Sequence, residues 1–264
     1  MFWNRNKKDK ATIANEKKRF NHLLSVAEKL PVKALPDLIR AIVRPVQSDF
    51  LLAVAEEGTD ARPDMTPQEF FFKGLTQIQS YEKMKECEMN GADYPLSLAS
   101  DIVLPWPWSL PRYIDNVSRI GTHKGKPWKQ DKNNHYVDLW LPWRIGFVHG
   151  GNHSITAGIL AGEGSLIPEH VYDMSWMFEL VRTDGNNWFV EGQKAEAVKS
   201  GRSAAVFEIG RLNRPGFPGE CFICELRLPD HRFRWKHNKL FLLLPEEYGP
   251  AFPAIVDCYT SPPT

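Results

Sequence analysis

The stretch WRIGFVHGGNHSITAGILAGEG, residues 143–164, decides the fold of this chain. It opens with β-branched and aromatic residues typical of a strand, then has two consecutive glycines. Small and apolar residues follow, and they favour a helix that stops at Gly162. The stretch therefore predicts a strand, a tight turn and a helix, with Ser154 as the N-cap of the helix.

The turn from Gly150 to Ser154 has the chemistry of an anion-binding site. Glycines allow a sharp turn, and a helix that begins there presents unpaired N–H groups and a positive dipole end. We therefore predict that a phosphate or carboxylate binds here, with His153 and Asn152 as candidate catalytic residues. The candidate ligand contacts are Gly150, Gly151, Ser154, Thr156 and Arg112. The alternative is a tight connection whose glycines only satisfy the backbone geometry.

The elements around the turn suggest a mixed sheet. Residues 136–141 and 143–148 are expected to be strands joined at Pro142, and residues 166–172 the next strand. Further along we expect a strand or short helix over 177–182, a turn at Asp184-Gly185, a helix over 193–199, and apolar runs at 204–209, 221–228 and 239–244. The last of these runs is a candidate central strand.

The N-terminal third is helical in its apolar spacing. Residues 14–57 predict short packed helices, with breaks at Pro31, Pro36 and Pro45. The sequence Thr66-Pro67-Gln68-Glu69 starts another helix, expected to end near Asn90-Gly91. The chain is therefore expected to be an α+β protein. Its predicted parts are an N-terminal helical region (1–93), a core (94–182) and a C-terminal β-rich extension (183–264).

Composition and charge exclude several classes. With 42% hydrophobic and 25% charged residues, the 264-residue chain is an ordinary folded protein and not a disordered one. A net charge of +1 supplies no general attraction for nucleic acid or anionic membranes, although residues 1–20 form a basic arm. No run reaches the ~20 apolar residues of a membrane span, and no signal peptide is evident. We expect a cytoplasmic protein with reduced cysteines, and no membrane partner.

The region from Asp101 to Asp173 resembles the ParB/sulfiredoxin superfamily, as a divergent bacterial member. The resemblance is carried by YVDLWL at 136–141, IGFVHGGNHS at 145–154, ITAGILA at 155–161 and IPEHV at 167–171. Upstream, residues 102–104 and Pro111-Arg112 lie where such domains often have a first strand and a proline-arginine segment. The resemblance implies a small mixed-sheet core that holds a phosphate-bearing ligand, and a nucleotide with Mg²⁺ as the cofactor.

Two positions depart from the resembled pattern. Asn152 stands where sulfiredoxins have the catalytic cysteine, so a thiolate nucleophile is absent and sulfinic acid reduction is not expected. Ser154 stands at the family arginine, which removes a bidentate phosphate contact. Backbone amides, Ser154, His153 and a distant arginine such as Arg112 remain able to hold an anion.

Other groups of residues allow other readings. Cys221 and Cys224 lie in an apolar, strand-like run, which favours buried thiols over a zinc knuckle. His149 and His153 lie four apart but across a turn, so we expect no protein metal site there. The tryptophans and the basic run 232–239 could contact nucleic acid, but packing in the core is the simpler explanation.

Three functions follow. The first is binding of a nucleotide or another anionic small molecule at the glycine turn, with hydrolysis or phosphotransfer as the reaction. The second is a non-enzymatic interaction or regulatory protein of a mobile element or defence locus, with a protein partner held by the N-terminal helices. The third is a DNA-associated factor or nuclease, whose binding would weaken steeply with salt.

Overall fold

The computed structural model describes residues 3–213, 232–236 and 239–243. Residues Met1–Pro215 form one compact unit and Gly216–Thr264 form a second. The first unit combines helices with a mixed sheet, so the expected α+β class is confirmed. No helix in the described ranges is long and apolar enough to cross a bilayer.

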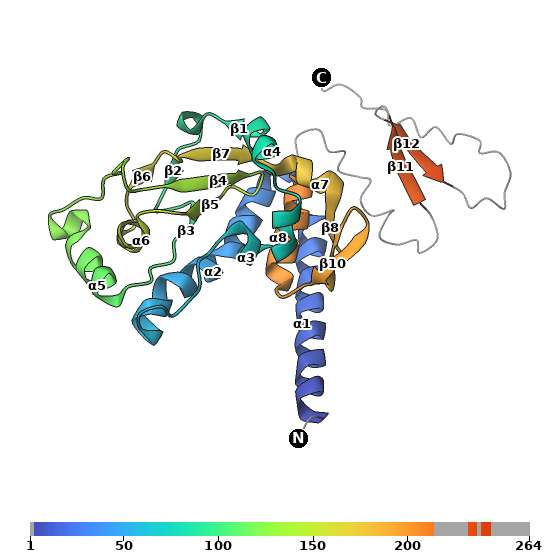
Figure 1. Ribbon diagram of the computed structural model, residues 1–264, viewed down its shortest axis with the longest axis horizontal. Helices are drawn as coiled ribbons and strands as arrows, with labels where there is room; N and C mark the ends of the chain where they lie inside the picture. The colour runs from blue at the N-terminus through green and yellow to red at the C-terminus, as the bar shows by residue number, and fades with distance from the viewer. Residues whose placement is uncertain (1–2, 214–231, 237–238, 244–264) are drawn as a thin grey trace. The chain divides into compact units, whose positions relative to one another are not determined.

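The main sheet has five strands in the order β1-β7-β4-β5-β3 (Figure 1). The predicted hairpin at Pro142 is confirmed: β4 and β5 pair antiparallel, with Val137 opposite Val148. Strand β3 pairs parallel with β5, β4 pairs parallel with β7, and β1 pairs antiparallel with β7. The strands are β1 (Glu88–Met89), β3 (Ile102–Leu104), β4 (Val137–Leu141), β5 (Ile145–Val148) and β7 (His170–Asp173).

The two faces of this sheet carry separate apolar clusters, because successive side chains of a strand point to opposite faces. Val137 and Leu139 pack in one cluster with Ile155 and Ala157 of α6 (Asn152–Ala161). Trp140 belongs to the other cluster, with residues of α2 (Leu35–Glu57) and α8 (Gly201–Leu212). Helix α5 (Leu110–Arg119) packs against α6 (Figure 1).

Helix α2 is longer than the sequence predicts. The expected break at Pro31 is present, since α1 (Trp3–Ala27) ends before it and a 3-10 turn (Val32–Ala34) follows. The expected breaks at Pro36 and Pro45 are wrong, because Pro36 lies in the first turn and Pro45 lies inside a continuous helix. A proline inside a helix costs roughly 3 kcal/mol. The long buried face of α2 offsets that cost, and the Gln47 side chain also donates to the Val103 carbonyl of edge strand β3 (2.6 Å).

The predicted helix from Thr66 to about Asn90 is broken into short pieces. Its start is as expected, because the Thr66 hydroxyl accepts from the Glu69 N–H. The helix then ends at Phe70, since Phe70, Phe71 and Phe72 are all buried and three consecutive residues cannot share one helix face. The chain turns extended at Phe72 instead. The pieces are α3 (Pro67–Phe70), a 3-10 helix (Lys73–Gln77) and α4 (Tyr81–Glu86).

The strand predicted over 166–172 is interrupted. Leu166 belongs to β6 (Ser165–Leu166), which pairs with β2 (Leu96–Ser97), and His170 begins β7. Between the two strands lie Ile167, Pro168 and Glu169, of which Pro168 has no N–H to donate to a ladder. Residues 165–173 thus form two short strands, β6 and β7, which belong to different sheets.

After residue 176, one predicted element is present and another is replaced by a strand. Residues 177–182 contain both expected forms, α7 (Met177–Leu180) and then β8 (Val181–Thr183). The helix predicted over 193–199 is wrong, because Glu191 and Gly192 both have positive φ and form a hairpin turn. This turn pairs β9 (Asn187–Val190) with β10 (Gln193–Ala197).

The described residues after 183 include a helix as well as strands. The apolar run 204–209 lies within helix α8, which packs against α1 (Figure 1). In the second unit, β11 (Arg232–Lys236) and β12 (Lys239–Leu243) form an antiparallel hairpin, with Trp235 opposite Leu240. The run 239–244 was predicted as a central strand, but in the described residues it pairs with β11 alone. The predicted run 221–228, with Cys221 and Cys224, lies outside the described residues.

Candidate functional site

A polar pocket of about 270 Å³ lies at the glycine turn. It forms where the parallel strands β3 and β5 end and the chain leaves them toward α5 and α6. Ligands of sheet-containing enzymes bind in the crevice beyond the carboxyl ends of such strands. The pocket is lined by Trp108, Arg112, Asn116, Asn134, His149, Gly150, Gly151, Asn152, His153 and Ser154.

The turn requires both of its glycines. Gly151 is the N-cap of α6 and has φ +75°, a left-handed conformation. A Cβ atom on Gly151 would lie 2.3 Å from Cδ2 of His135, and one on Gly150 would lie 2.5 Å from the Tyr136 ring. The predicted N-cap Ser154 is wrong: the helix begins earlier, which places Ser154 in its first turn. The close contacts thus support the alternative that the glycines satisfy the backbone geometry. Both glycines also line the pocket.

The first turn of α6 keeps its backbone donors open. The Ile155 N–H already bonds to the Gly151 carbonyl (2.9 Å), and no side chain caps the helix. Among the described residues no acceptor bonds the N–H groups of Asn152, His153 or Ser154. These unpaired donors and the positive end of the helix dipole favour an anion in the pocket.

Asn152 and His153, the predicted catalytic residues, line the pocket but are themselves engaged. Oδ1 of Asn152 accepts from the Trp106 N–H (2.9 Å), and Nε2 of His153 accepts from the Ser109 N–H (3.0 Å). Both side chains are buried. Burial and the nearby Arg112 lower the pKa of His153, so its imidazole is neutral at pH 7. Both residues hold the loop after β3 against α6.

Arg112 brings positive charge to the pocket from a separate element. It lies in the first turn of α5, which begins at the Ser109 N-cap. Its guanidinium carbon lies 5.1 Å from the centre of the Trp108 ring, and that ring meets the His153 ring edge-on at 5.4 Å. The structure thus places Arg112 in the same pocket wall as the glycine turn, which lies about 40 positions further along the chain.

Thr156 lies apart from the other predicted site residues. Its side chain is fully buried, it is not part of the pocket wall, and its hydroxyl has no hydrogen-bond partner among the described residues. Thr156 therefore belongs to the packed side of α6.

His149 and Asp138 form a pair that the sequence analysis did not place in the site. His149 lines the pocket, and its Nε2 lies 2.8 Å from Oδ2 of Asp138. The bond to Asp138 is the largest of the effects that raise the pKa of His149, with Asp64 and Glu169 adding to it against the effect of burial. The predicted hairpin indicates that Asp138 and His149 could lie on one face of the sheet. Whether the two side chains meet depends on the register of β4 and β5, which the sequence does not give.

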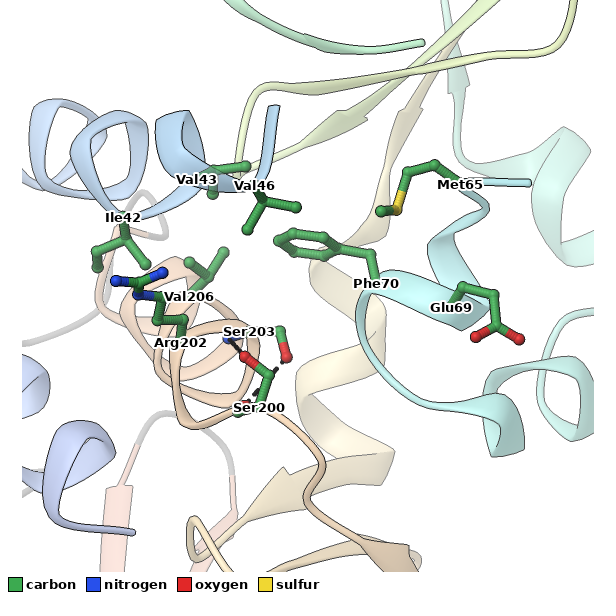
Figure 2. Close-up of a pocket in the computed structure, with 10 residues that line it drawn as sticks. All are labelled: Ile42, Val43, Val46, Met65, Glu69, Phe70, Ser200, Arg202, Ser203 and Val206. Atoms are coloured by element: carbon green, nitrogen blue, oxygen red, sulfur yellow. Dashed lines mark hydrogen bonds between the residues drawn. The ribbon is translucent and has the colours of Figure 1, made fainter. Parts of the chain in front are cut away.

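A second pocket, of about 160 Å³, lies between α2, α3 and α8. Figure 2 shows Val46, Phe70 and Val206 pointing toward one another in it, with the Glu69 carboxylate turned away. The Ser200 and Ser203 side chains there are occupied in the N-cap of α8. This pocket is mainly apolar, so the polar pocket at the glycine turn is the better place for an anion.

Metal and thiol chemistry find little support in the described ranges. No group of three or more His, Cys, Asp or Glu side chains is arranged there to hold a metal ion. Cys87 is a free thiol, and burial raises its pKa, which disfavours the reactive thiolate. Several tryptophans serve the core, as expected: Trp128, Trp140, Trp143 and Trp188 are buried.

Comparison with known proteins gives a family but no activity. No curated protein and no solved structure gives a significant match to this chain. Residues 4–215 match a family described as being of unknown function, DUF6710. That range contains the whole sheet, both pockets and helix α8. The chain therefore belongs to the DUF6710 family.

Proposed function

We propose that the pocket at the glycine turn binds a phosphate-bearing small molecule, a nucleotide being the first candidate. The observation that carries the proposal is the meeting of two sources of positive potential in one pocket. These are the open first turn of α6 and the Arg112 guanidinium from α5. Neither source is adjacent to the other in sequence, so their convergence supports a ligand site over a simple turn.

The size and polarity of the pocket favour the phosphate end of such a ligand. Pockets that enclose whole drug-sized ligands measure roughly 300–1,000 Å³. At about 270 Å³ this pocket suits one or two phosphate groups, with the rest of the molecule at its mouth. Side-chain amides of Asn116 and Asn134 in the wall can donate to phosphate oxygens. Mg²⁺ would arrive with the nucleotide and take oxygen ligands from its phosphates.

The proposed likeness to ParB/sulfiredoxin domains is supported by the order of elements alone. Strand β3, helix α5 with Arg112, the β4–β5 hairpin, helix α6 and strand β7 follow one another in the chain. This is the order in which the resemblance sets a first strand, a proline-arginine segment, the glycine turn, a small-residue helix and the next strand. The proposal of a phosphate ligand stands on the pocket and does not need this likeness.

Calorimetry tests the proposal. The four nucleoside triphosphates, pyrophosphate and orthophosphate are titrated into the full-length protein, with and without Mg²⁺. We expect at least one of them to bind, and Arg112→Ala to weaken that binding about tenfold or more, because hydrogen bonds to charged groups contribute about 1.5–3 kcal/mol.

Arg119→Ala is the matched control. Arg119 lies at the other end of α5, where it pairs with Asp115, and it is not part of the pocket wall. Its removal should leave binding within twofold of wild type. Absence of heat with every probe, or equal loss in both variants, would contradict the proposal. The first of these outcomes would favour the alternative of a non-enzymatic interaction protein.

A further inference from the structure

The two histidines beside the glycine turn, four positions apart, have opposite environments. His153 is buried, and its Nε2 accepts from a backbone N–H, which requires the neutral ring at that nitrogen. The His149 side chain is 45% exposed, and its Nε2 faces the carboxylate of Asp138 at 2.8 Å. A histidine that donates to a carboxylate from one nitrogen keeps the other nitrogen for chemistry. In His149 that nitrogen is Nδ1.

The pairing of His149 with Asp138 is fixed by the sheet. Asp138 lies opposite Phe147 in the β4–β5 ladder, and His149 follows Phe147 by two residues, on the same face. The other oxygen of Asp138, Oδ1, is buried and has no hydrogen-bond partner among the described residues. His149 is therefore the principal partner that compensates this carboxylate, which orients the imidazole.

Beside Asp138, the charges around His149 come from two further segments of the chain. Asp64 approaches from the segment before α3, and Glu169 from the segment before β7. Both act with Asp138 to raise the pKa of His149, whereas Arg112 acts on His153. These carboxylates thus increase the share of His149 that is in the imidazolium form, the form that can give up a proton.

We propose that His149, oriented by Asp138, is the proton donor of a hydrolytic reaction in this pocket, on a phosphate monoester or phosphoanhydride. The inference rests on the proposed function, since the phosphate must first bind beside His149. Water attacks phosphorus, and the bond between phosphorus and the leaving-group oxygen breaks. The proton on Nδ1 passes to that oxygen, the attacking water releases one proton to solvent, and solvent reprotonates the ring.

Phosphate release and ligand binding are measured separately, on the full-length protein. The substrates are the nucleoside triphosphate and pyrophosphate probes with Mg²⁺, together with p-nitrophenyl phosphate. We expect wild type to release phosphate from at least one of them. His149→Gln should slow release about 100-fold or more, the range for loss of a general acid, while binding changes less than fivefold.

The Asp138→Asn variant tests the pH dependence of the rate, which would not shift if Asp138 had only a structural role. A reaction that needs a protonated acid slows as pH rises through the pKa of that acid. The change removes the carboxylate that raises the pKa of His149, so the alkaline limb of the rate profile should move to lower pH. The pH profile of Asp138→Asn also tests the role of His149 if circular dichroism shows that His149→Gln does not fold.

His22→Gln is the control. His22 is an exposed histidine of helix α1 that is not part of the pocket wall. Its removal should leave the rate and the pH profile unchanged. Binding without phosphate release in wild type, wild-type rates in His149→Gln, or an unmoved limb in Asp138→Asn would overturn the inference and leave anion binding standing. Absence of any binding overturns the proposed function and this inference together.

Discussion

Gly151 occupies a backbone conformation that only glycine adopts easily, in a place where even a methyl group has no room. Its φ of +75° costs an L-residue roughly 1–2 kcal/mol, and the missing Cβ leaves space for the His135 ring. His135 is held in turn, stacked on Trp128 at 4.9 Å, with its Nδ1 accepting from the Asp131 N–H. A Cβ atom added at Gly151 would therefore displace His135 and disturb its contacts with Trp128 and Asp131.

Replacing Gly151 with alanine should lower the free energy of unfolding by about 2–5 kcal/mol, the sum of the backbone penalty and overpacking. The control is Gly162→Ala at the opposite end of α6, where φ is +67° and a Cβ would meet nothing within 4 Å. That variant should show the backbone penalty alone. Urea unfolding of both proteins checks the difference, and equal losses would mean that the contact with His135 does not matter.

At the scale of elements, the loop from Gly121 to Trp128 is tied to α6 by one carboxylate. Glu163, just after the helix, accepts from the Thr122 N–H (2.9 Å) and from the Trp128 N–H (2.7 Å). The Thr122 side chain, and after it these two backbone bonds, lower the pKa of Glu163 to about 2, from an ordinary value of 4.5. Trp128 in turn donates from its ring to the Ser154 carbonyl, so the clamp reaches the first turn of α6.

The stabilisation from Glu163 should depend on pH. Because the pKa of this carboxyl is lower in the folded state, its contribution is complete above about pH 4.5 and is lost as pH falls toward about 2. Glu163→Gln should therefore lower Tm relative to wild type at pH 6, and the difference should shrink through that window. Calorimetry measures both proteins, with Glu86→Gln, an exposed i,i+3 pair, as the control. A Tm difference that stays constant from pH 6 to pH 2 would count against the clamp.

Prediction of these elements from sequence succeeded where the signal was local and failed where distant contacts decided. The N-cap at Thr66 and the hairpin at Pro142 depend on neighbouring residues, and both are present. The end of α3 at Phe70 depends on the core, which buries three consecutive phenylalanines. The glycine turn could be predicted from its own residues, and Arg112 was proposed from the family resemblance. The pairing of His149 with Asp138 depends on the register of the sheet, which local sequence does not give.

At the scale of the compact unit Met1–Pro215, α8 joins parts that are far apart in the sequence. It packs against α1, α2 and β8. Glu208 accepts from the Thr183 N–H and pairs with Arg211, whose guanidinium donates to the carbonyls of Phe178 and Val181. All of these groups are buried, so they satisfy one another at the centre of the unit.

Helix α8 also makes a very close contact with the segment that leads into β5 and the pocket. A Cβ on Gly210 would lie 2.1 Å from Nε1 of Trp143, and Trp143 is fully buried among Phe71, Phe178 and Phe207. Such a ring cannot move aside cheaply, because a close-packed interior passes strain to its neighbours. Trp143 lies two residues before β5, and His149 directly follows the last residue of that strand.

Gly210→Ala should therefore destabilise the unit by about 1–3 kcal/mol, the usual cost of overpacking a core. If the unit unfolds cooperatively, tryptophan fluorescence and release of the phosphate ligand that we propose for the glycine turn should report the same urea midpoint, shifted equally from wild type. Arg202→Lys, on the same helix but half-buried and without a clash, should change the midpoint by less than about 0.5 kcal/mol equivalent. Separate midpoints for the two probes would mean that the pocket and the α8 core fold independently.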